Sequence, residues 1–233
     1  MVSLRDGTAA FAELKLKPAA EVDETLFEGT DTTFLGEQIR TPISIASTAF
    51  HKMAHPDGEI ATARAANNFL QTPLLLSNWA TSTIEEVSQN APDAMKMYQI
   101  YMSKSETVND DMWKRCRENG YKAMCLTSDT QLLGKRDQDV RVKFELPKHL
   151  DLANLAPYSS SGESSAITST TQSALAEYVA NHKNNDIDWS IIPYVKRVSQ
   201  LPVFAKGIMC YEDALLALEN GADGLFVSNH GAR

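Results

Sequence analysis

Residues 201–233 of this 233-residue chain read LPVFAKGIMCYEDALLALENGADGLFVSNHGAR. Two short apolar runs, at 203–205 and 225–227, flank a helical pattern at 211–219 that Gly221 closes. Continuous rather than alternating apolarity is typical of strands buried on both faces of a parallel sheet. The stretch therefore predicts a strand, a helix and a second parallel strand, the repeating unit of an α/β fold.

The same order recurs toward the N-terminus. Helices are expected at residues 56–69 and 107–118. A capping box at Ser82-Thr83-Ile84-Glu85 is expected to open another helix, and residues 188–190 are expected to begin a further one. A repeat of roughly 22–30 residues suits the strand–helix–strand unit. Four further apolar runs are the expected strands, at residues 43–46, 74–76, 97–101 and 123–126.

One interval breaks this rhythm. The segment between Leu126 and Val203 is much longer than the others and contains a Ser/Thr-rich run at 159–173. We expect residues 134–188 to form an inserted lid or substrate loop. The whole of 1–233 is otherwise expected to be a single domain, because a chain of this length suits one sizeable core.

Composition excludes several classes of partner. The net charge of 22 − 30 = −8 argues against nucleic acid or an anionic membrane as the main partner. No apolar stretch reaches the roughly 18 residues of a membrane span, and no signal-peptide pattern is present. Cys116, Cys125 and Cys210 have no CxxC spacing, which favours a reducing compartment over a disulfide framework, with Cys125 in the core.

Polar residues follow each predicted strand at the point where its apolar run ends. In a (β/α)₈ barrel the active site is built at the carboxyl ends of the strands. The sequence therefore predicts a TIM (β/α)₈ barrel, incomplete here with about six β/α units, and a site at that end. These polar stretches are Ser47-Thr48-Ala49, Ser77-Asn78-Trp79, Gln99 with Tyr101, Thr127-Ser128-Asp129-Thr130, Lys206-Gly207 and Ser228-Asn229-His230-Gly231-Ala232-Arg233.

These motifs, together with Met53-Ala54-His55-Pro56-Asp57-Gly58-Glu59 and Gly134-Lys135-Arg136, resemble the FMN-dependent 2-hydroxy acid oxidases and dehydrogenases, and among them the glycolate oxidase branch most. The resemblance runs from about Ala10 to Arg233. It implies FMN as cofactor and oxidation of an (S)-2-hydroxy acid, glycolate or a longer-chain one, to the 2-oxo acid. Oxygen would reoxidise the flavin and give hydrogen peroxide.

The resemblance also implies roles for individual residues. His230 matches the base that removes a substrate proton, and Asp129 matches the carboxylate that orients it. Arg136 and Arg233 match the pair that holds the substrate carboxylate, which a guanidinium fork fits bidentately. Tyr101 matches a hydroxyl that hydrogen-bonds the substrate and takes part in catalysis. Taken singly, His230 and Asp129 could instead be turn or cap residues, Arg136 part of a solvated charge run, and Tyr101 an amphipathic barrel residue with a solvated hydroxyl.

The remaining matches concern the pocket and the cofactor. Trp79 matches an aromatic wall of the substrate pocket, with a core Trp as the alternative. Lys206 matches a cation near N1 and O2 of the flavin, where the reduced ring is negatively charged. A metal pair at His51 and His55 is not expected, because Pro56 interrupts the helix and no third ligand is placed. The implied cofactor-binding residues are Thr48, Ala49, Ser77, Gln99, Thr127, Lys206 and Ser228.

The family pattern extends beyond both ends of this chain. An N-terminal segment and two last strands with an FMN-phosphate grip are expected parts of the family, so we interpret the chain as a partial sequence. The alternative function is a truncated, non-catalytic paralogue or binding subunit that holds FMN poorly. The resemblance further implies a homo-oligomer, commonly a tetramer, and a peroxisomal location whose signal would lie beyond Arg233, with the cytoplasm as the other expectation.

Overall fold

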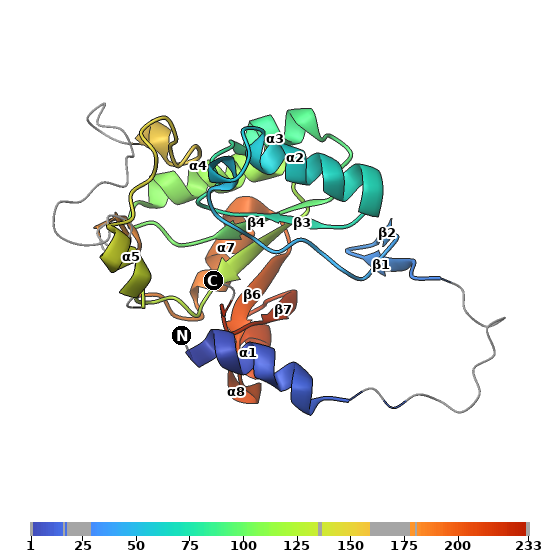
Figure 1. Ribbon diagram of the computed structural model, residues 1–233. Coiled ribbons are helices and arrows are strands. Elements are labelled where there is room, and N and C mark those ends of the chain that lie inside the picture. The colour runs from blue at the N-terminus through green and yellow to red at the C-terminus, as the bar shows by residue number, and fades with distance from the viewer. Residues whose placement is uncertain are drawn as a thin grey trace.

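A parallel sheet forms the centre of the computed structural model, which describes residues 2–15, 17, 29–134, 137–158, 178–179 and 181–231 (Figure 1). The sheet has five strands in the order β3-β4-β5-β6-β7, so neighbours in the chain are neighbours in the sheet. Sequential parallel order is that of a (β/α)₈ barrel. The strands are β3 (Leu74–Leu76), β4 (Lys96–Ile100), β5 (Ala123–Thr127), β6 (Val203–Ile208) and β7 (Gly224–Val227).

Helices form a layer along one face of the sheet. Helix α2 packs against α3, α3 against α4 and α4 against α7, while α8 lies against β6 and β7 (Figure 1). None of the helices within the described part of the chain is long and apolar enough to span a membrane. The helices are α1 (Val2–Glu13), α2 (Gly58–Ala65), α3 (Ile84–Asn90), α4 (Glu106–Glu118), α5 (Asp137–Val142), α7 (Ile191–Ser199) and α8 (Tyr211–Glu219), with short turns η2 (His51–Met53), η3 (Ala66–Leu70) and η4 (Ala156–Tyr158).

Strand side chains alternate between two apolar clusters. Positions such as Leu76 and Ile100 face the helices, where they join the larger core around Trp113. The intervening positions, Leu75 and Met97 among them, form a smaller cluster on the opposite, interior face. Because successive side chains of a strand point to opposite faces, strands buried on both sides require the continuous apolarity seen in the sequence.

A short hairpin that the sequence did not predict covers the interior cluster. Strands β1 (Thr32–Phe34) and β2 (Glu37–Ile39) pair antiparallel. The ring of Phe34 lies 6.0 Å from that of Phe204 on β6. Each strand is only three residues long, so no periodicity could reveal it.

The prediction of a strand at residues 43–46 was wrong, because only an isolated parallel bridge between Ile45 and Leu74 forms there. Pro42 has no N–H to donate to a ladder. The hydroxyl of Thr72 donates to the Ile43 carbonyl, which takes the place of a strand partner. The side chain of Ile43 is exposed, so this run is not buried on both faces.

The capping box lies one residue later than expected. Thr83 is the N-cap of α3, where its hydroxyl accepts from the Glu86 amide and the Glu86 carboxylate accepts from the Thr83 amide. Ser82 does not cap the helix because its hydroxyl donates to the buried carboxylate of Glu59 at 2.9 Å. The helix expected at 107–118 is confirmed and begins at Glu106.

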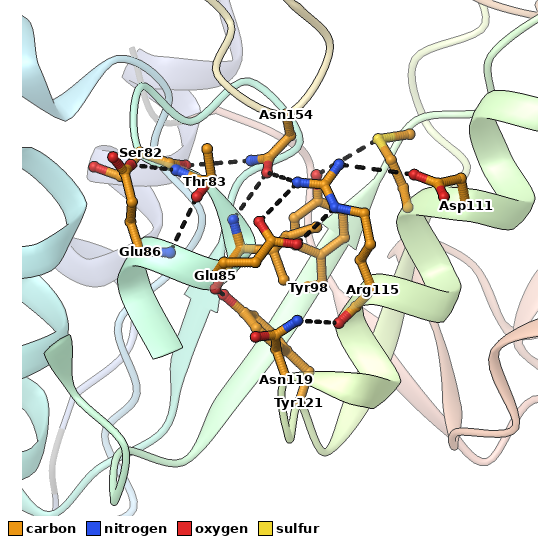
Figure 2. A network of polar contacts seen from close by, with 12 residues as sticks. Ser82, Thr83, Glu85, Glu86, Tyr98, Asp111, Arg115, Asn119, Tyr121 and Asn154 are labelled. Carbon is orange, nitrogen blue, oxygen red and sulfur yellow. Dashed lines mark hydrogen bonds and ion pairs between the residues drawn. The ribbon is translucent and has the colours of Figure 1, made fainter. Parts of the chain in front are cut away.

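A polar network fastens the segment after residue 150 to helices α3 and α4 (Figure 2). Arg115 on α4 donates to both carboxylate oxygens of Glu85 on α3, at 2.7 and 2.8 Å. Asn154 accepts from the Ile84 amide at 2.9 Å and donates to the Ser82 carbonyl at 3.2 Å. The ion pair between Glu85 and Arg115 lowers the pKa of Glu85 and raises that of Arg115. Residues 159–177 of the expected lid lie outside the described residues, and the role of the lid stays a prediction.

Candidate active site

The interior face of the sheet changes from apolar to polar at the carboxyl ends of the strands. Its apolar layer contains Leu75, Met97 and Cys125, with Phe204 and Phe226 packed against them. Side chains two residues apart on a strand point to the same face. A polar residue follows each of these five apolar positions, two residues further along the strand. All five polar residues were expected to bind the cofactor: Ser77, Gln99, Thr127, Lys206 and Ser228.

Hydrogen bonds join three members of this polar layer. The Ser77 hydroxyl donates to Oε1 of Gln99 at 3.4 Å, and Nε2 of Gln99 donates to the Thr127 hydroxyl at 2.8 Å. The Asn78 amide also donates to Gln99 Oε1, at 3.3 Å. All are buried, so their orientation is set by one another. The layer presents fixed donors and acceptors at the ends of β3, β4 and β5.

Lys206 supplies a buried positive charge to the same layer. Its side chain stands on β6, and the residue is 8% exposed. Among the described residues its Nζ has no hydrogen-bond acceptor, and the Asp129 carboxylate is its electrostatic partner. The Lys206 carbonyl accepts from the amide and hydroxyl of Ser128, at 2.8 and 2.7 Å, which ties the end of β5 to β6.

Three residues expected to act in catalysis come together beyond the strand ends. Nδ1 of His230 lies 2.9 Å from Oδ1 of Asp129. An ionised carboxylate only accepts, so Nδ1 donates to Asp129 and Nε2 is the ring nitrogen left to exchange a proton. The Tyr101 hydroxyl lies 3.4 Å from that Nε2. The His230 backbone has a φ of +53° and its amide donates to the Ser228 hydroxyl at 3.1 Å.

Asp129 is held ionised by its surroundings. Burial raises the pKa of its carboxyl, but the hydrogen bond and charge of His230 and the charge of Lys206 outweigh burial, and the pKa lies below its ordinary value. Its Oδ2 is buried without a hydrogen-bond partner among the described residues. Gly207 makes this packing possible: its φ is +102°, and a Cβ there would lie 2.5 Å from the Asp129 side chain.

An aromatic pair borders the site. The rings of Trp79 and Tyr101 lie 4.6 Å apart, within an apolar cluster that includes Leu146 and Val179. Ala49 packs against this cluster, while Thr48 is exposed and its hydroxyl donates to the Ala46 carbonyl at 3.5 Å. Trp79 and Ala49 therefore belong to the cluster that contains Tyr101, while the pocket wall expected of Trp79 and the flavin contact expected of Ala49 stay predictions.

Two expected substrate-binding residues, Arg136 and Arg233, lie outside the described residues. The histidines that were discounted as a metal pair have other contacts: His51 Nδ1 lies 3.0 Å from the Thr62 hydroxyl, and His55 Nδ1 accepts from the Asp57 amide. Within the described ranges, no group of three His, Cys, Asp or Glu side chains could hold a metal ion.

Sequence reasoning assigned no role to Glu59 or Lys183, two buried charged residues near the site. Glu59 accepts from the His51 amide at 3.0 Å and the Thr81 amide at 2.9 Å, which holds the loop after β3. It lies in the quoted 53–59 motif, and that position was the available signal. Lys183 lies beyond the Ser/Thr-rich run, and nothing in the neighbouring residues distinguishes it.

The model of the family described as FMN-dependent dehydrogenase matches residues 1–233. The chain belongs to the FMN-dependent dehydrogenase family. Among curated relatives of this chain, glycolate oxidase 3 of Arabidopsis thaliana is 40% identical over 231 residues, covering 99% of this chain and 61% of the relative. Glycolate oxidase of Spinacia oleracea is 38% identical with the same coverage. The chain spans about three fifths of the length of these relatives.

Solved structures of the family share the fold. A mandelate oxidase with (S)-4-hydroxymandelic acid superposes with a TM-score of 0.87 at 28% identity, covering 99% of this chain and 62% of that one. A lactate oxidase of Pediococcus acidilactici gives 0.82 at 28% identity, covering 99% and 58%. The chain is therefore an α/β protein with part of a (β/α)₈ barrel, as predicted.

Membership implies FMN as the cofactor, and the polar layer of this chain fits a flavin. A flavin ring edge needs hydrogen-bond donors and acceptors and, when reduced, a nearby positive charge. The buried Gln99 and Thr127 side chains supply the former. The buried ammonium of Lys206, which has no described acceptor, supplies the latter.

Proposed function

We propose that this protein oxidises an (S)-2-hydroxy acid to the 2-oxo acid, with FMN as cofactor, O₂ as final acceptor and hydrogen peroxide as second product. The observation that carries the proposal is the His230–Asp129 pair, 2.9 Å apart, with the Tyr101 hydroxyl at the other imidazole nitrogen. The names of its relatives are consistent with this class, since glycolate, lactate and mandelate are all 2-hydroxy acids.

His230 is the proposed base. Its Nε2 accepts a proton from the substrate, and the Asp129 carboxylate stabilises the imidazolium that results. Bound FMN would supply the acceptor for the accompanying hydride equivalent, with O₂ as the final oxidant that takes up two electrons and two protons. The pKa of Asp129 is lowered from its ordinary value, which favours the charged carboxylate that an imidazolium needs as its partner.

The substrate is proposed to bind through three kinds of contact. Tyr101 would hydrogen-bond the substrate oxygen, and Trp79 beside it would form an apolar wall. Arg136 and Arg233 are proposed to clamp the substrate carboxylate, because a guanidinium fork matches its two oxygens. The inserted region 134–188 is the proposed lid.

The cofactor is proposed to lie against the polar layer. Gln99 and Thr127 would contact the flavin ring, and Lys206 would offset the negative charge of its reduced form. The proposed set is completed by Thr48, Ala49, Ser77 and Ser228.

The test is anaerobic flavin reduction. The purified chain is mixed with FMN, and its flavin absorbance is followed after glycolate, (S)-lactate or (S)-mandelate is added. Bleaching by an (S)-acid but not by its (R)-enantiomer, followed by peroxide release when air is admitted, is the expected result. A chain that binds FMN but shows no bleaching with any of these acids would refute the proposal.

The same measurement separates the enzyme from a non-catalytic subunit. A chain that gains no flavin absorbance with added FMN would favour the subunit. The tetramer and the peroxisomal location stay predictions, to be checked by light scattering of the purified protein and by imaging of the tagged protein in cells.

A further inference from the structure

We propose that Lys183 is a positioning residue of this site: its ammonium holds the turn at Asp129 and Thr130 and thereby aligns the Asp129 carboxylate with His230. The effect of Lys183 on catalysis rests on the proposed function, whereas the contacts that carry the inference do not depend on the cofactor. No role was assigned to Lys183 from the sequence, and it lies in the chain before α7, far from the motifs that define the site.

The backbone places Lys183 beside the end of β4. Lys183 forms an antiparallel bridge with Ser103, just after Tyr101. The Asn184 amide donates to the Met102 carbonyl at 2.7 Å, and the Lys104 amide donates to the His182 carbonyl at 3.0 Å. Hydrogen bonds on both sides of Lys183 therefore fix its Cα relative to the strand that carries Tyr101.

The side chain then reaches across to the end of β5. Lys183 is 6% exposed, and its Nζ donates to the Thr130 carbonyl and, at 3.2 Å, to Oδ1 of Asn185. The same Nζ lies 5.9 Å from the centroid of the Tyr101 ring. One ammonium thus contacts the turn behind His230 and the ring whose hydroxyl faces His230.

Holding Thr130 also holds Asp129. The Thr130 hydroxyl donates to Oδ1 of Asp129 at 3.1 Å, the same oxygen that accepts from His230. A displacement of the Thr130 peptide would move both this hydroxyl and the backbone of Asp129. The ammonium of Lys183 therefore acts on the imidazole through Asp129, without touching it.

Core packing does not account for a lysine at this position. Burial lowers the pKa of Lys183, and the Asp129 carboxylate opposes that effect. A methionine of similar volume would fill the space without desolvating a charge. Three cationic or protonatable side chains surround the Asp129 carboxylate: Lys183, Lys206 and His230. The Tyr101 hydroxyl lies beyond the imidazole.

The experiment follows the Nδ1–H proton of His230 by NMR in the full chain without cofactor. A proton held between imidazole and carboxylate resonates far downfield and exchanges slowly with water, and its absence in His230→Gln assigns it. Lys183→Met is expected to accelerate its exchange at least about tenfold, the scale of one lost charge-assisted hydrogen bond. Lys183→Arg, which keeps a buried cation that can donate to the Thr130 carbonyl, is expected to restore slow exchange.

Lys196→Met is the matched control. Lys196 also fixes a loop, donating to the Gly221 carbonyl and to Asp223 at 2.9 Å each, but it does so before β7. We expect it to lower thermal stability without changing the His230 proton. If Lys183→Met leaves the exchange rate unchanged, or if Lys196→Met accelerates it equally, the positioning role is overturned.

Asn185→Ala keeps the test decisive should Lys183→Met fail to fold. It removes only the second acceptor of Nζ, so a smaller acceleration in the same direction is expected, and no change counts against the proposal. Because the readout needs neither FMN nor turnover, a failure of the hydroxy acid reaction would leave this result standing, and the converse also holds.

Discussion

Nδ1 of His230 lies 2.9 Å from Oδ1 of Asp129, although 101 positions separate them in the chain. Asp129 follows β5 and His230 follows β7, while β6 lies between these strands. The contact therefore crosses the end of β6, where Gly207 leaves room for the carboxylate. The pair depends on sequential strand order and on one residue without a side chain.

Gly207→Ala is expected to disrupt this crossing. A methyl group there would lie 2.5 Å from Cβ and Cγ of Asp129 and would also require an alanine at φ +102°. Gly221→Ala is the control, because its φ is +92° with open space around the position. We expect about 1 kcal/mol of destabilisation at Gly221 from the backbone alone. Gly207→Ala should cost clearly more in urea denaturation, and equal losses would contradict the predicted clash.

Asp129→Asn is expected to destabilise the fold in a pH-dependent way. The pKa of Asp129 is lowered in the folded state, so its carboxylate stabilises the protein above the unfolded pKa of about 3.9. That stabilisation is lost as the pH falls through the lower folded pKa. Near pH 7 the loss should be about 3 kcal/mol, because buried lysines lose their counter-charge.

Urea unfolding of wild type and Asp129→Asn at pH 7 and near pH 3 checks this expectation. The difference between the two proteins should shrink at the lower pH. A difference that is the same at both pH values would mean that the charge of Asp129 does not contribute to stability.

Glu59→Gln is expected to cost about 2–4 kcal/mol, because a buried hub that accepts from several donors loses its charge. Its carboxylate accepts from the His51 and Thr81 amides and from the Thr81 and Ser82 hydroxyls. Glu37→Gln, which breaks an exposed pair with Lys122, should change the unfolding free energy by less than about 1 kcal/mol. Comparable effects of the two substitutions would argue against a hub at Glu59.

Arg115 and Glu85 are expected to be energetically coupled. Their side chains are 18% and 32% exposed, and both carboxylate oxygens accept from the guanidinium (Figure 2). A double-mutant cycle with Arg115→Met and Glu85→Gln should give about 1–2 kcal/mol of coupling. The exposed pair Lys114–Glu118, 3.8 Å apart, should give under about 0.5 kcal/mol. A coupling free energy of that smaller size for Arg115 and Glu85 would show that the network orients these side chains without stabilising the fold.

His230→Gln should slow anaerobic flavin reduction by a 2-hydroxy acid about 10²–10⁴-fold, the usual contribution of a general base. Binding of FMN, followed by flavin fluorescence quenching, should stay near wild type, because the polar layer is untouched. His55→Gln removes a histidine whose contact is with the Asp57 amide, away from His230, and serves as control. A rate unaffected by His230→Gln would remove that imidazole from the mechanism.

Much of the fold follows from local pattern. The runs at 74–76, 123–126 and 203–205 became strands because continuous apolarity requires burial on both faces. The polar residues after them could be proposed as a site, since parallel strands bring their carboxyl ends to one edge. The family resemblance added roles for His230 and Asp129 that no single motif could carry.

Other features depend on contacts between distant segments. Ser82 was expected to cap a helix, but the carboxylate of Glu59, which is 23 positions away, takes its hydroxyl. The hairpin β1–β2 owes its place to Phe34 packing against Phe204. Neither is visible in a window of a few residues, because the partner lies elsewhere in the chain.

The sequence by itself determined the class of fold, the edge of the sheet that bears the chemistry, and the residue types available there. It could do so because strand burial and side-chain alternation are local properties of the backbone. Only the tertiary structure decided how the polar groups meet: that Gln99 bonds to Thr127, that the expected Asp129–His230 pair joins Oδ1 to Nδ1, and that Lys183 reaches Thr130. Those contacts require the strand order and the close approach at Gly207, which arise only when the sheet has formed.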